Sequence, residues 1–349
     1  MRRNMRAVVI DAPRSVALRN LADEAPGPGE VSIRVLATGI CGTDVEIFDG
    51  TMPYFTMGMA RYPVVPGHEW VGEVIACGEG VARFQCGDRV VGECSVGCMR
   101  CTVCLAGNYH RCPNRTETGI LNRPGAFAET IRFPALFLHK ISRDVPIEAA
   151  ALIEPSAVAF NGVRIAAVSP RDDVAILGDG PIGLLLLQMA RAFGARRVVV
   201  VGGTPHRLAL AERLGAHAVI DIADGRVVER LVEAAGGERP AVVIEATGNP
   251  AAVNTAVEAV APGGRLVLQG LFAGRKADGV DLDRIVTADI MLRGALGSPG
   301  VWDDVIGLVE SGRVDPAALV SERLKLADFE KGIGLVKARS GVKLVVEPA

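Results

Sequence analysis

The sequence predicts an α/β protein that combines an irregular antiparallel β-barrel with a doubly wound parallel sheet. Two sequence patterns, one in each half of the chain, support this prediction. Over the first ~150 residues, short β-prone runs such as RAVVI, VSIRVLA, EWVGEVIA and DRVVGE are broken by frequent Gly and Pro, a pattern typical of irregular barrels. From Val174 onward, apolar strand runs alternate with amphipathic helical runs, which predicts right-handed βαβ units on a parallel sheet.

The elements of the second half follow one another in a regular order. VAILG precedes the helical run PIGLLLLQMARAFG, VVVVG precedes PHRLALAERLG, and AVVIEATG, NPAAVNTAVEAV and RLVLQG continue the series. After Met291 the alternation stops, 302–311 is predicted to be helical, and VKLVV at 342–346 predicts a closing strand. We expect this tail to rejoin the N-terminal domain. The predicted domains are therefore residues 1–155 with 296–349, and residues 156–295.

Composition and charge exclude several classes of function. A chain of 349 residues with 49% hydrophobic residues can form substantial cores in two domains, or in one large discontinuous domain. Its net charge of −2 favours neither nucleic acid nor an anionic membrane surface. No apolar run is as long as a membrane span. Residues 1–6 are basic but lead into VVIDAP, which is no signal-peptide core, so we expect a cytoplasmic protein.

Four cysteines lie close together in the run GCMRCTVCLAGNYHRC, at Cys98, Cys101, Cys104 and Cys112. Thiolates at this spacing can surround one tetrahedral Zn²⁺ and complete its coordination, which leaves no position for a substrate. A disulfide pair is the alternative, but it requires an oxidising compartment. The sequence therefore predicts that residues 94–112 form a loop stabilised by a structural zinc ion.

The glycine-rich run GDGPIG at 178–183 lies between a predicted strand and a predicted helix, the context of a dinucleotide-binding turn. Gly178 permits the tight turn, Gly180 lets the backbone approach a pyrophosphate, and Gly183 lets the helix pack on the strand. Pro181 and Ile182 begin the helix, whose N-terminus offers N–H groups to the phosphates. A merely structural turn is the alternative. The context favours a Rossmann domain over 156–295 that binds NAD(H) or NADP(H).

The acid that usually binds the adenosine ribose is missing from its expected place. Such an acid stands about 20 residues further on, at the end of the next strand. Here that strand ends at VVVVGG, and Gly202 occupies the acidic position, so the sequence predicts no carboxylate there to repel a 2′-phosphate. Thr204, His206 and Arg207 follow and could contact such a phosphate, although an Arg on this helix could equally face solvent. The sequence therefore leaves NAD and NADP open, or tilts the choice toward NADP.

Three further segments carry side chains that are competent zinc ligands. They are Cys41 in CGTD, His68 and Glu69 in PGHE, and Glu154 immediately before Pro155. Taken singly, Cys41 could be a small core residue, His68 a turn histidine with its partners satisfied, and Glu154 a carboxylate at a helix end. Spacing alone cannot join positions so far apart in the chain.

A resemblance to a known family links these three segments. CGTD, GHEWVGEV, GDRV, the four-cysteine run and GDGPIG occur in the order found in zinc-dependent medium-chain dehydrogenases, which the chain resembles over essentially its whole length. It is most similar to the polyol and threonine dehydrogenase branch, in which an acid occupies the third metal position. The resemblance implies a GroES-like barrel as the catalytic domain, two zinc ions per subunit, and a homo-oligomer that is often a dimer or tetramer.

By this resemblance, Cys41 and His68 hold a catalytic zinc ion, Glu154 occupies the position of a third ligand, and Glu69 either ligates directly or replaces water in some states. Thr43 would hydrogen-bond the substrate oxygen and pass its proton outward. Asp44 would be a partner of His68. The nicotinamide is expected to lie along two short runs, namely Gly270, Leu271 and Phe272, and Ala295 to Gly297.

One position departs from the family pattern. Several relatives carry a relay histidine three residues after the CGTD threonine, where this chain has Glu46. Glu46 could relay protons, hydrogen-bond a polyol hydroxyl, or face solvent as most Glu side chains do. The departure puts the direct transfer of a relative's substrate to this chain in doubt. The loop 48–62, which mixes Phe, Tyr and Met with an Arg, is expected to shape the pocket.

The leading hypothesis is an oxidoreductase that transfers a hydride between a secondary alcohol, such as a polyol, sugar or cyclitol, and NAD(P), without a nucleic-acid or membrane partner. A simple alcohol or aldehyde dehydrogenase of the same fold is an alternative. A zinc-bearing dinucleotide sensor without turnover is an alternative of another class. Such a sensor would need the glycine-rich turn but not the ligands Cys41, His68 and Glu154 together with Thr43, so their joint presence counts against it.

Overall fold

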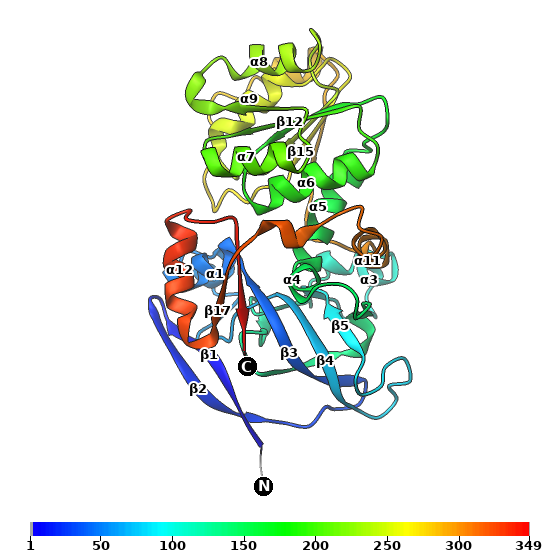
Figure 1. Cartoon of the computed structure of the whole chain (residues 1–349), viewed down its shortest axis with the longest axis vertical. Coiled ribbons are helices and arrows are strands. Elements are labelled where there is room, and N and C mark those ends of the chain that lie inside the picture. Colours follow the sequence, from blue (N-terminus) through cyan, green and yellow to red (C-terminus); the bar gives the residue numbers. More distant parts are fainter. Residues whose placement is uncertain (1–2, 349) are drawn as a thin grey trace. The chain divides into compact units, whose positions relative to one another are not determined.

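The computed structural model describes residues 3–348, which fall into two compact units. The first unit combines Met1–Glu154 with Gly297–Ala349, and the second is Pro155–Leu296. Each unit has its own main sheet (Figure 1). Each also has its own apolar core. Among the described residues, no helix is both long enough and apolar enough to cross a bilayer.

Short strands separated by turns make up most of the first unit, in keeping with its frequent Gly and Pro. Its strands are β1 (Arg3–Ala12), β2 (Ser15–Asp23), β3 (Glu30–Ile40), β4 (Glu69–Cys77), β5 (Arg89–Gly92), β6 (Ser95–Val96), β7 (Thr116–Thr118), β8 (Asn122–Arg123), β9 (Thr130–Pro134), β10 (Leu138–Lys140), β17 (Val320–Lys325) and β18 (Lys343–Glu347). Its helices are α1 (Gly42–Asp49), α2 (Pro53–Thr56), α3 (Thr102–Leu105), α4 (Ile147–Ala151), α11 (Trp302–Glu310) and α12 (Phe329–Lys337), with 3₁₀ turns η1 (Tyr109–Arg111), η2 (Ala135–Phe137), η4 (Pro316–Leu319) and η5 (Leu326–Asp328).

A seven-stranded sheet forms the centre of this unit, in the order β10-β5-β4-β3-β18-β17, with β9 also paired to β3. Its pairs are antiparallel except β17 with β18. On β3, alternate apolar residues such as Val31, Ile33 and Val35 are buried against the ring of Trp70 on β4. The Trp70 and Phe133 rings meet edge to face at 5.2 Å, which anchors this core.

The C-terminal tail completes the sheet that the N-terminal strands begin. Strand β18 pairs antiparallel with β3, with Leu344 opposite Ile40 and Val346 opposite Thr38. Helix α12 packs beside α1, as the red and blue segments show in Figure 1. Side chains from both ends of the chain therefore share one core, and β18 brings residues of the tail next to the end of β3.

The second unit is a parallel six-stranded sheet with helices between its strands. Its strands, in the order β13-β12-β11-β14-β15-β16, are β11 (Asp173–Leu177), β12 (Arg197–Gly202), β13 (Ala218–Asp221), β14 (Val242–Glu245), β15 (Arg265–Leu268) and β16 (Met291–Gly294). Its helices are α5 (Ile153–Ile165), whose first two residues belong to the first unit, α6 (Pro181–Ala192), α7 (Pro205–Arg213), α8 (Val227–Ala234), α9 (Pro250–Ala259) and α10 (Leu282–Thr287), with the 3₁₀ turn η3 (Ile222–Asp224).

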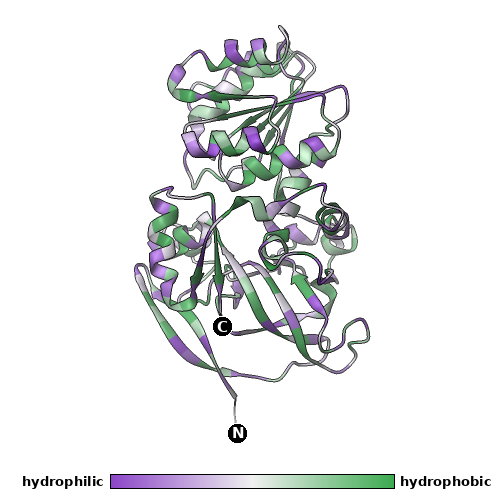
Figure 2. Cartoon of the chain, viewed as in Figure 1, coloured by the Kyte–Doolittle hydropathy of each residue, from purple (hydrophilic) through white to green (hydrophobic). Residues whose placement is uncertain are grey.

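Every neighbouring pair in this sheet is parallel. The central strands β11 and β14 are buried at every residue, as expected when helices cover both faces of a parallel sheet. Figure 2 shows the strands of this sheet as mostly hydrophobic, whereas the helices around them carry hydrophilic patches. The predicted fold class, an irregular barrel with a doubly wound parallel sheet, is confirmed.

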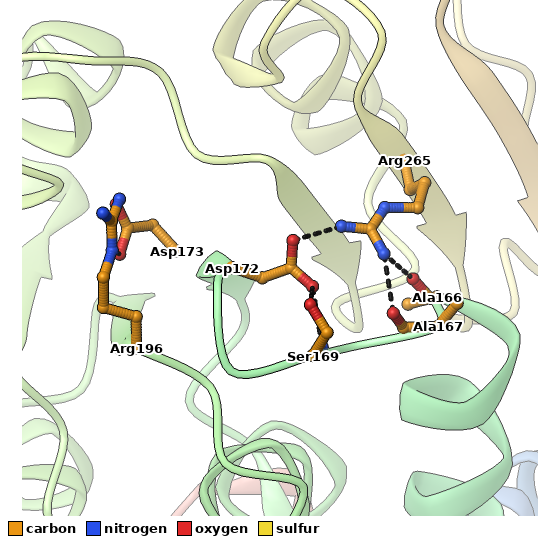
Figure 3. A network of polar contacts seen from close by, with 7 residues as sticks. All are labelled: Ala166, Ala167, Ser169, Asp172, Asp173, Arg196 and Arg265. Carbon is orange, nitrogen blue, oxygen red and sulfur yellow. Dashed lines mark hydrogen bonds and ion pairs between the residues drawn. The ribbon is translucent and has the colours of Figure 1, made fainter.

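A partly buried arginine fixes the loop that leads into β11. Arg265, on β15, donates to the carbonyl oxygens of Ala166 and Ala167 at 3.0 and 2.6 Å, just past the end of α5, and to Asp172 (Figure 3). Carbonyls at a helix C-terminus lack partners within the helix, so this contact satisfies them. Asp172 also accepts from the N–H and hydroxyl of Ser169 at 2.7 and 2.9 Å. The strand that ends at the glycine-rich run therefore starts from a braced loop.

Candidate active site, zinc centres and dinucleotide turn

The four-cysteine run folds into a small lobe around α3 and η1. The sulfur atoms of Cys98, Cys101, Cys104 and Cys112 all lie within 4.8 Å of one another. The Cys98 and Cys104 sulfurs are 4.0 Å apart, and those of Cys101 and Cys112 are 3.8 Å apart. Sulfurs bound to one tetrahedral zinc ion at about 2.3 Å would be separated by about 3.8 Å, so these residues fit a closed four-thiolate site. None of the eight cysteines, which all lie within residues 3–348, forms a disulfide.

The electrostatics of the lobe favour a cation between the sulfurs. The backbone N–H groups of Arg100 and Cys101 lower the pKa of the Cys98 thiol to about 6. Desolvation and the neighbouring sulfurs raise the pKa of Cys104 to about 12. Four sulfurs this close cannot all ionise without a positive charge among them, and zinc supplies that charge when it binds such a ligand set.

A second group of metal-binding side chains forms where β3 and β4 run side by side. The register pairs Gly39 with Glu69, so Cys41, just beyond the end of β3, comes next to His68, just before β4. One ligand atom each from Cys41, His68 and Glu69 lies within 4.8 Å of the others, and His68 and Glu69 are buried. A thiolate, an imidazole and a carboxylate are competent zinc ligands, so these residues fit a metal centre distinct from the lobe.

Asp44 holds the two ligand-bearing segments together. Its side chain is fully buried and accepts from the N–H of Cys41 at 2.8 Å and from the N–H of Gly67 at 3.3 Å. Its Oδ1 also lies 3.9 Å from Nδ1 of His68. Burial raises the pKa of Asp44, while His68 and the Cys41 N–H lower it. The structure therefore places Asp44 beside His68, as the resemblance implied, and adds a direct bond to the backbone of Cys41.

A buried ion pair lies behind the carboxylate of Glu69. Lys343, on β18, is 3% exposed, and its Nζ lies 2.6 and 2.5 Å from the two carboxylate oxygens of Glu69. Burial alone would lower the pKa of Lys343, but Glu69 and Cys41 raise it, so the lysine stays charged. A methyl group added at Gly39 would lie 2.2 Å from Glu69 Oε2, so only glycine leaves room for the pair. Sequence reasoning missed Lys343; a lone Lys inside the apolar run VKLVV was the available signal.

Glu154, Thr43 and Glu46 lie around this centre in different ways. Glu154 is 7% exposed but does not belong to the group of ligand atoms within 4.8 Å. Burial raises its pKa to about 7, with His68 lowering it and Glu69 raising it, which places Glu154 within electrostatic reach of both. The hydroxyl of Thr43 is 3.9 Å from the Cys41 sulfur. Glu46 is half-buried one helical turn after Thr43 on α1, so the two share a face of that helix.

The glycine-rich run has the geometry of a dinucleotide-binding turn. Gly178 has a φ of +131°, which L-residues with a side chain rarely adopt. Gly180 caps α6 and has open space where a side chain would stand, so a phosphate can approach its backbone. A methyl group at Gly183 would lie 1.9 Å from the carbonyl oxygen of Gly178, so helix and strand can pack only with glycine there. Pro181 and Ile182 form the first turn of α6. The cradle fits a pyrophosphate.

The end of β12 differs from the expectation of an acid-free site. Asp179, from the glycine-rich run, extends over Gly202, and its Oδ2 accepts from the N–H groups of Gly203 and Thr204 at 3.0 and 2.7 Å. Residue 202 itself carries no carboxylate, but the carboxylate of Asp179 lies beside it, which the sequence did not predict. Arg207 on α7 is only 9% exposed, so it is packed into the fold rather than extended toward solvent.

The runs expected near the nicotinamide lie at loops after β15 and β16. The N–H of Gly270 donates to Glu245 O at 3.1 Å, and the N–H of Ala295 donates to Leu268 O at 2.9 Å. Leu271 is 63% exposed, whereas Phe272 packs against the core of the second unit. Gly297 is the first residue of the chain's return to the first unit and has a φ of +60°.

Two further carboxylates brace these regions, and sequence reasoning did not find either. Glu245 is fully buried, and its Oε1 accepts from the N–H groups of Thr247 and Gly248 at 2.6 and 3.0 Å. Glu93 accepts from the Tyr109 hydroxyl of the zinc lobe at 2.6 Å and bonds His139 at 3.0 Å. Each is a single acid between apolar residues, and nothing in spacing marks its partners.

Comparison with known proteins identifies the family to which this architecture belongs. A model described as an alcohol dehydrogenase GroES-like domain matches residues 27–143, and a model described as a zinc-binding dehydrogenase matches 181–311. The chain is 33% identical to an erythritol/L-threitol dehydrogenase of Mycolicibacterium smegmatis, covering 99% of this chain and 98% of the relative. It is 31% identical to an L-threonine 3-dehydrogenase of Vibrio parahaemolyticus, covering 92% of each.

A solved structure agrees with the sequence relatives. A zinc-binding dehydrogenase of Sinorhizobium meliloti 1021 bound to NADP superposes with a TM-score of 0.93 at 31% identity, covering 99% of this chain and 100% of that chain. Similarity at this level, over nearly the whole length, is what members of one family share. The chain belongs to the zinc-dependent medium-chain dehydrogenases that use NAD(P), in the branch of the polyol and threonine dehydrogenases.

Proposed function

We propose that this dehydrogenase oxidises a secondary alcohol of the polyol, sugar or cyclitol class, and reduces the matching ketone in the reverse direction. The observation that carries the proposal is the hydroxyl of Thr43, 3.9 Å from the sulfur of Cys41 in the group formed with His68 and Glu69. A proton acceptor beside a mixed zinc-ligand set is what alcohol oxidation requires. The erythritol/L-threitol dehydrogenase among the relatives supports a polyol as substrate.

In this proposal the first unit is the catalytic domain and the second binds the cofactor. Cys41, His68 and Glu154 would hold the catalytic zinc, with Glu69, which is paired with Lys343, as an alternating ligand. The bound ion would polarise the substrate oxygen and lower the pKa of its hydroxyl. Thr43 would accept the hydroxyl proton and pass it outward, while the substrate carbon gives its hydride to the nicotinamide. The four-cysteine lobe would hold a second, structural zinc ion.

A nicotinamide absorbance assay against a panel of alcohols tests the proposal. The panel contains erythritol, sorbitol, myo-inositol, L-threonine, 2,3-butanediol and 2-propanol, each with NAD and with NADP. We expect the highest kcat/KM among the polyols and the cyclitol. A preference for 2-propanol would favour a simple alcohol dehydrogenase. Tight cofactor binding without turnover on any alcohol would favour a sensor.

We also propose that the protein works as a homo-oligomer in the cytoplasm. Strand β16 lies at the edge of the parallel sheet, all four of its residues are exposed, and Met291 and Leu292 are among them. Leu282 and Val286 on α10 are also exposed. An open strand edge with apolar side chains invites pairing with a second copy. The cytoplasm is supported by the eight cysteines, none of which is paired. Light scattering of wild type and Leu292→Lys tests the oligomer, and a monomeric wild type would contradict it.

A further inference from the structure

The place that normally decides between NAD and NADP is built differently in this chain. In a dinucleotide-binding domain, an acid at the end of the second strand accepts a hydrogen bond from the adenosine ribose and repels a 2′-phosphate. Strand β12 ends in Gly202, which has no side chain. A neutral strand end of this kind would be permissive toward NADP if nothing else occupied the space.

The side chain of Asp179 occupies that space. A methyl group built on Gly202 would lie 2.5 Å from both Cβ and Oδ2 of Asp179, closer than non-bonded atoms approach. The carboxylate of Asp179 therefore stands where a side chain from position 202 would begin. Only glycine at position 202 leaves room for the Asp179 side chain. The absence of an acid at 202 and the presence of one at 179 therefore belong together.

The backbone donors beside Gly202 are already engaged. The N–H groups of Gly203 and Thr204 donate to Asp179 Oδ2 at 3.0 and 2.7 Å, and Thr204 is the N-cap of α7. Free N–H groups at a helix N-terminus are what a phosphate would use for binding. Here a carboxylate takes both, so a 2′-phosphate would lose these donors and face a negative charge. Both bonds go to Oδ2, which leaves Oδ1 on the carboxylate to accept from a ribose hydroxyl.

We propose that Asp179, carried by the glycine-rich turn, replaces the acid at the end of β12 as the residue that binds the adenosine ribose, so that the enzyme selects NAD over NADP. The inference rests on the proposed function as an NAD(P)-dependent dehydrogenase. It reverses the tilt toward NADP that Gly202 alone predicts. A different role for Asp179 is purely structural: the two N–H bonds could brace the turn against β12 without any contact with cofactor.

Equilibrium binding distinguishes the two roles without requiring turnover. Kd values for NAD and NADP are measured separately, by quenching of protein fluorescence or calorimetry, on the full-length zinc-loaded protein. Wild type should bind NAD at least about tenfold more tightly than NADP, because one charge-assisted hydrogen bond gained and one repulsion avoided both favour NAD. In Asp179→Asn, which keeps an oxygen for the two N–H groups but loses the charge, this ratio should fall by about 10- to 100-fold, chiefly through tighter NADP binding.

Two matched variants sharpen the test. Asp221→Asn removes the same charge from the end of the neighbouring strand β13, whose Asp221 lies opposite Gly202 and accepts from the N–H of Ala223 at 2.9 Å. It should leave the ratio within about twofold of wild type, since a charge without contact acts weakly across water. The double variant Asp179→Gly with Gly202→Asp also removes the Cβ of residue 179 that would clash with a side chain at 202. It returns the acid to the strand end and should restore the preference for NAD that Asp179→Gly loses.

The outcomes separate the inference from the proposed function. A purely structural Asp179 predicts that both cofactors weaken equally in Asp179→Ala, with an unchanged ratio, and that result would overturn the inference. If Asp221→Asn changed the ratio of the two Kd values as much as Asp179→Asn does, the inference would also be overturned. A charge without contact with the cofactor would then be enough to set the preference. A wild type that binds both cofactors equally well would also defeat the inference while leaving the dehydrogenase assignment intact. A wild type that binds neither cofactor would defeat the proposed function, and the inference with it.

Discussion

The two metal-ligand groups of this protein are assembled in opposite ways. The four cysteines of the lobe come from fifteen consecutive residues, and α3, η1 and their turns bring the sulfurs together locally. The group of Cys41, His68 and Glu69 depends on the register of β3 with β4, and on a lysine from β18. We therefore expect the lobe to need its metal in order to fold, and the second group to be held in place by the strands before metal binds.

The largest effect is expected from the lobe. Cys101→Ser should prevent zinc binding in the lobe and greatly reduce the yield of folded protein. The reason is that structural zinc contributes about 10–16 kcal/mol of apparent binding free energy in isolated zinc-finger peptides. Zinc content and the thermal unfolding midpoint measure the effect. Cys86→Ser is the matched control, since Cys86 is exposed and outside both ligand groups. A folded Cys101→Ser protein with two zinc ions would contradict the assignment of the lobe.

Cys41→Ser should instead abolish turnover while the fold survives. One zinc ion per chain should remain, and the midpoint of thermal unfolding should stay close to that of wild type, because β3, β4 and Asp44 hold the site together without the metal. Metal analysis with circular dichroism checks both expectations. If this variant lost as much folded protein as Cys101→Ser, the contrast between the two centres would be wrong.

Thr43→Ala should lower kcat by about 10²–10⁴-fold, the usual contribution of a proton-transfer group. Cofactor Kd should not change, since Thr43 belongs to the first unit and is expected to act on the substrate oxygen. Thr43→Ser keeps a hydroxyl and should retain much of the activity. Steady-state kinetics on the best polyol decide the matter, and equal losses in both variants would show that Thr43 only packs.

Lys343→Met should destabilise the fold by about 3–5 kcal/mol, because it leaves Glu69 as a buried charge without its partner. The exposed pair Lys331–Glu322, 2.8 Å apart, provides the control. Lys331→Met should destabilise the fold far less, because surface ion pairs contribute little. Urea unfolding of the three proteins gives the comparison. Similar costs for both lysines would mean that the Glu69 pair contributes no more than a surface contact.

The smallest effect is expected for the pH dependence of stability that His139 contributes through its contacts with Glu93 and Asp303, beside the four-cysteine lobe. His139 lies 3.0 Å from Glu93 and 2.9 Å from Asp303, and its ring stacks on Trp302. Burial lowers the pKa of His139, but the two carboxylates outweigh it and raise the pKa above its usual value. A raised pKa means that this stabilisation is complete below the unfolded pKa of about 6.5 and is lost as pH rises through the folded pKa.

The midpoint of thermal unfolding, followed from pH 5.5 to 8.5, tests this contribution. The difference in unfolding midpoint between wild type and His139→Gln should be largest at pH 5.5 and should become smaller as the pH increases. His206→Gln, at an exposed position on α7, controls for the loss of a histidine as such. A gap that is constant across this range would mean that packing against Trp302, and not charge, holds the brace.

The contrast between the centres also explains how much could be predicted. Alternation of apolar runs and dense turns predicts the two kinds of sheet, and both are present, because these patterns act over a few residues. The four-cysteine spacing and the GDGPIG turn act over the same short range. By contrast, nothing near Cys41 in the sequence names Glu69 or Lys343 as its neighbours, and only family resemblance joined the ligands. The carboxylate of Asp179 was visible in the sequence, but its position over Gly202 depends on how β11 and β12 align.

The place of Lys343 on β18 has a consequence for the order of events during synthesis. The zinc lobe has all its ligands once Cys112 has left the ribosome, so it can take up metal while most of the protein is still being made. The partner of Glu69 emerges far later, and until then β3 lacks its neighbour β18 and the carboxylate lacks its cation. Glu69 therefore depends on a residue 274 positions further along the chain, whereas the cysteines of the lobe all lie within fifteen residues.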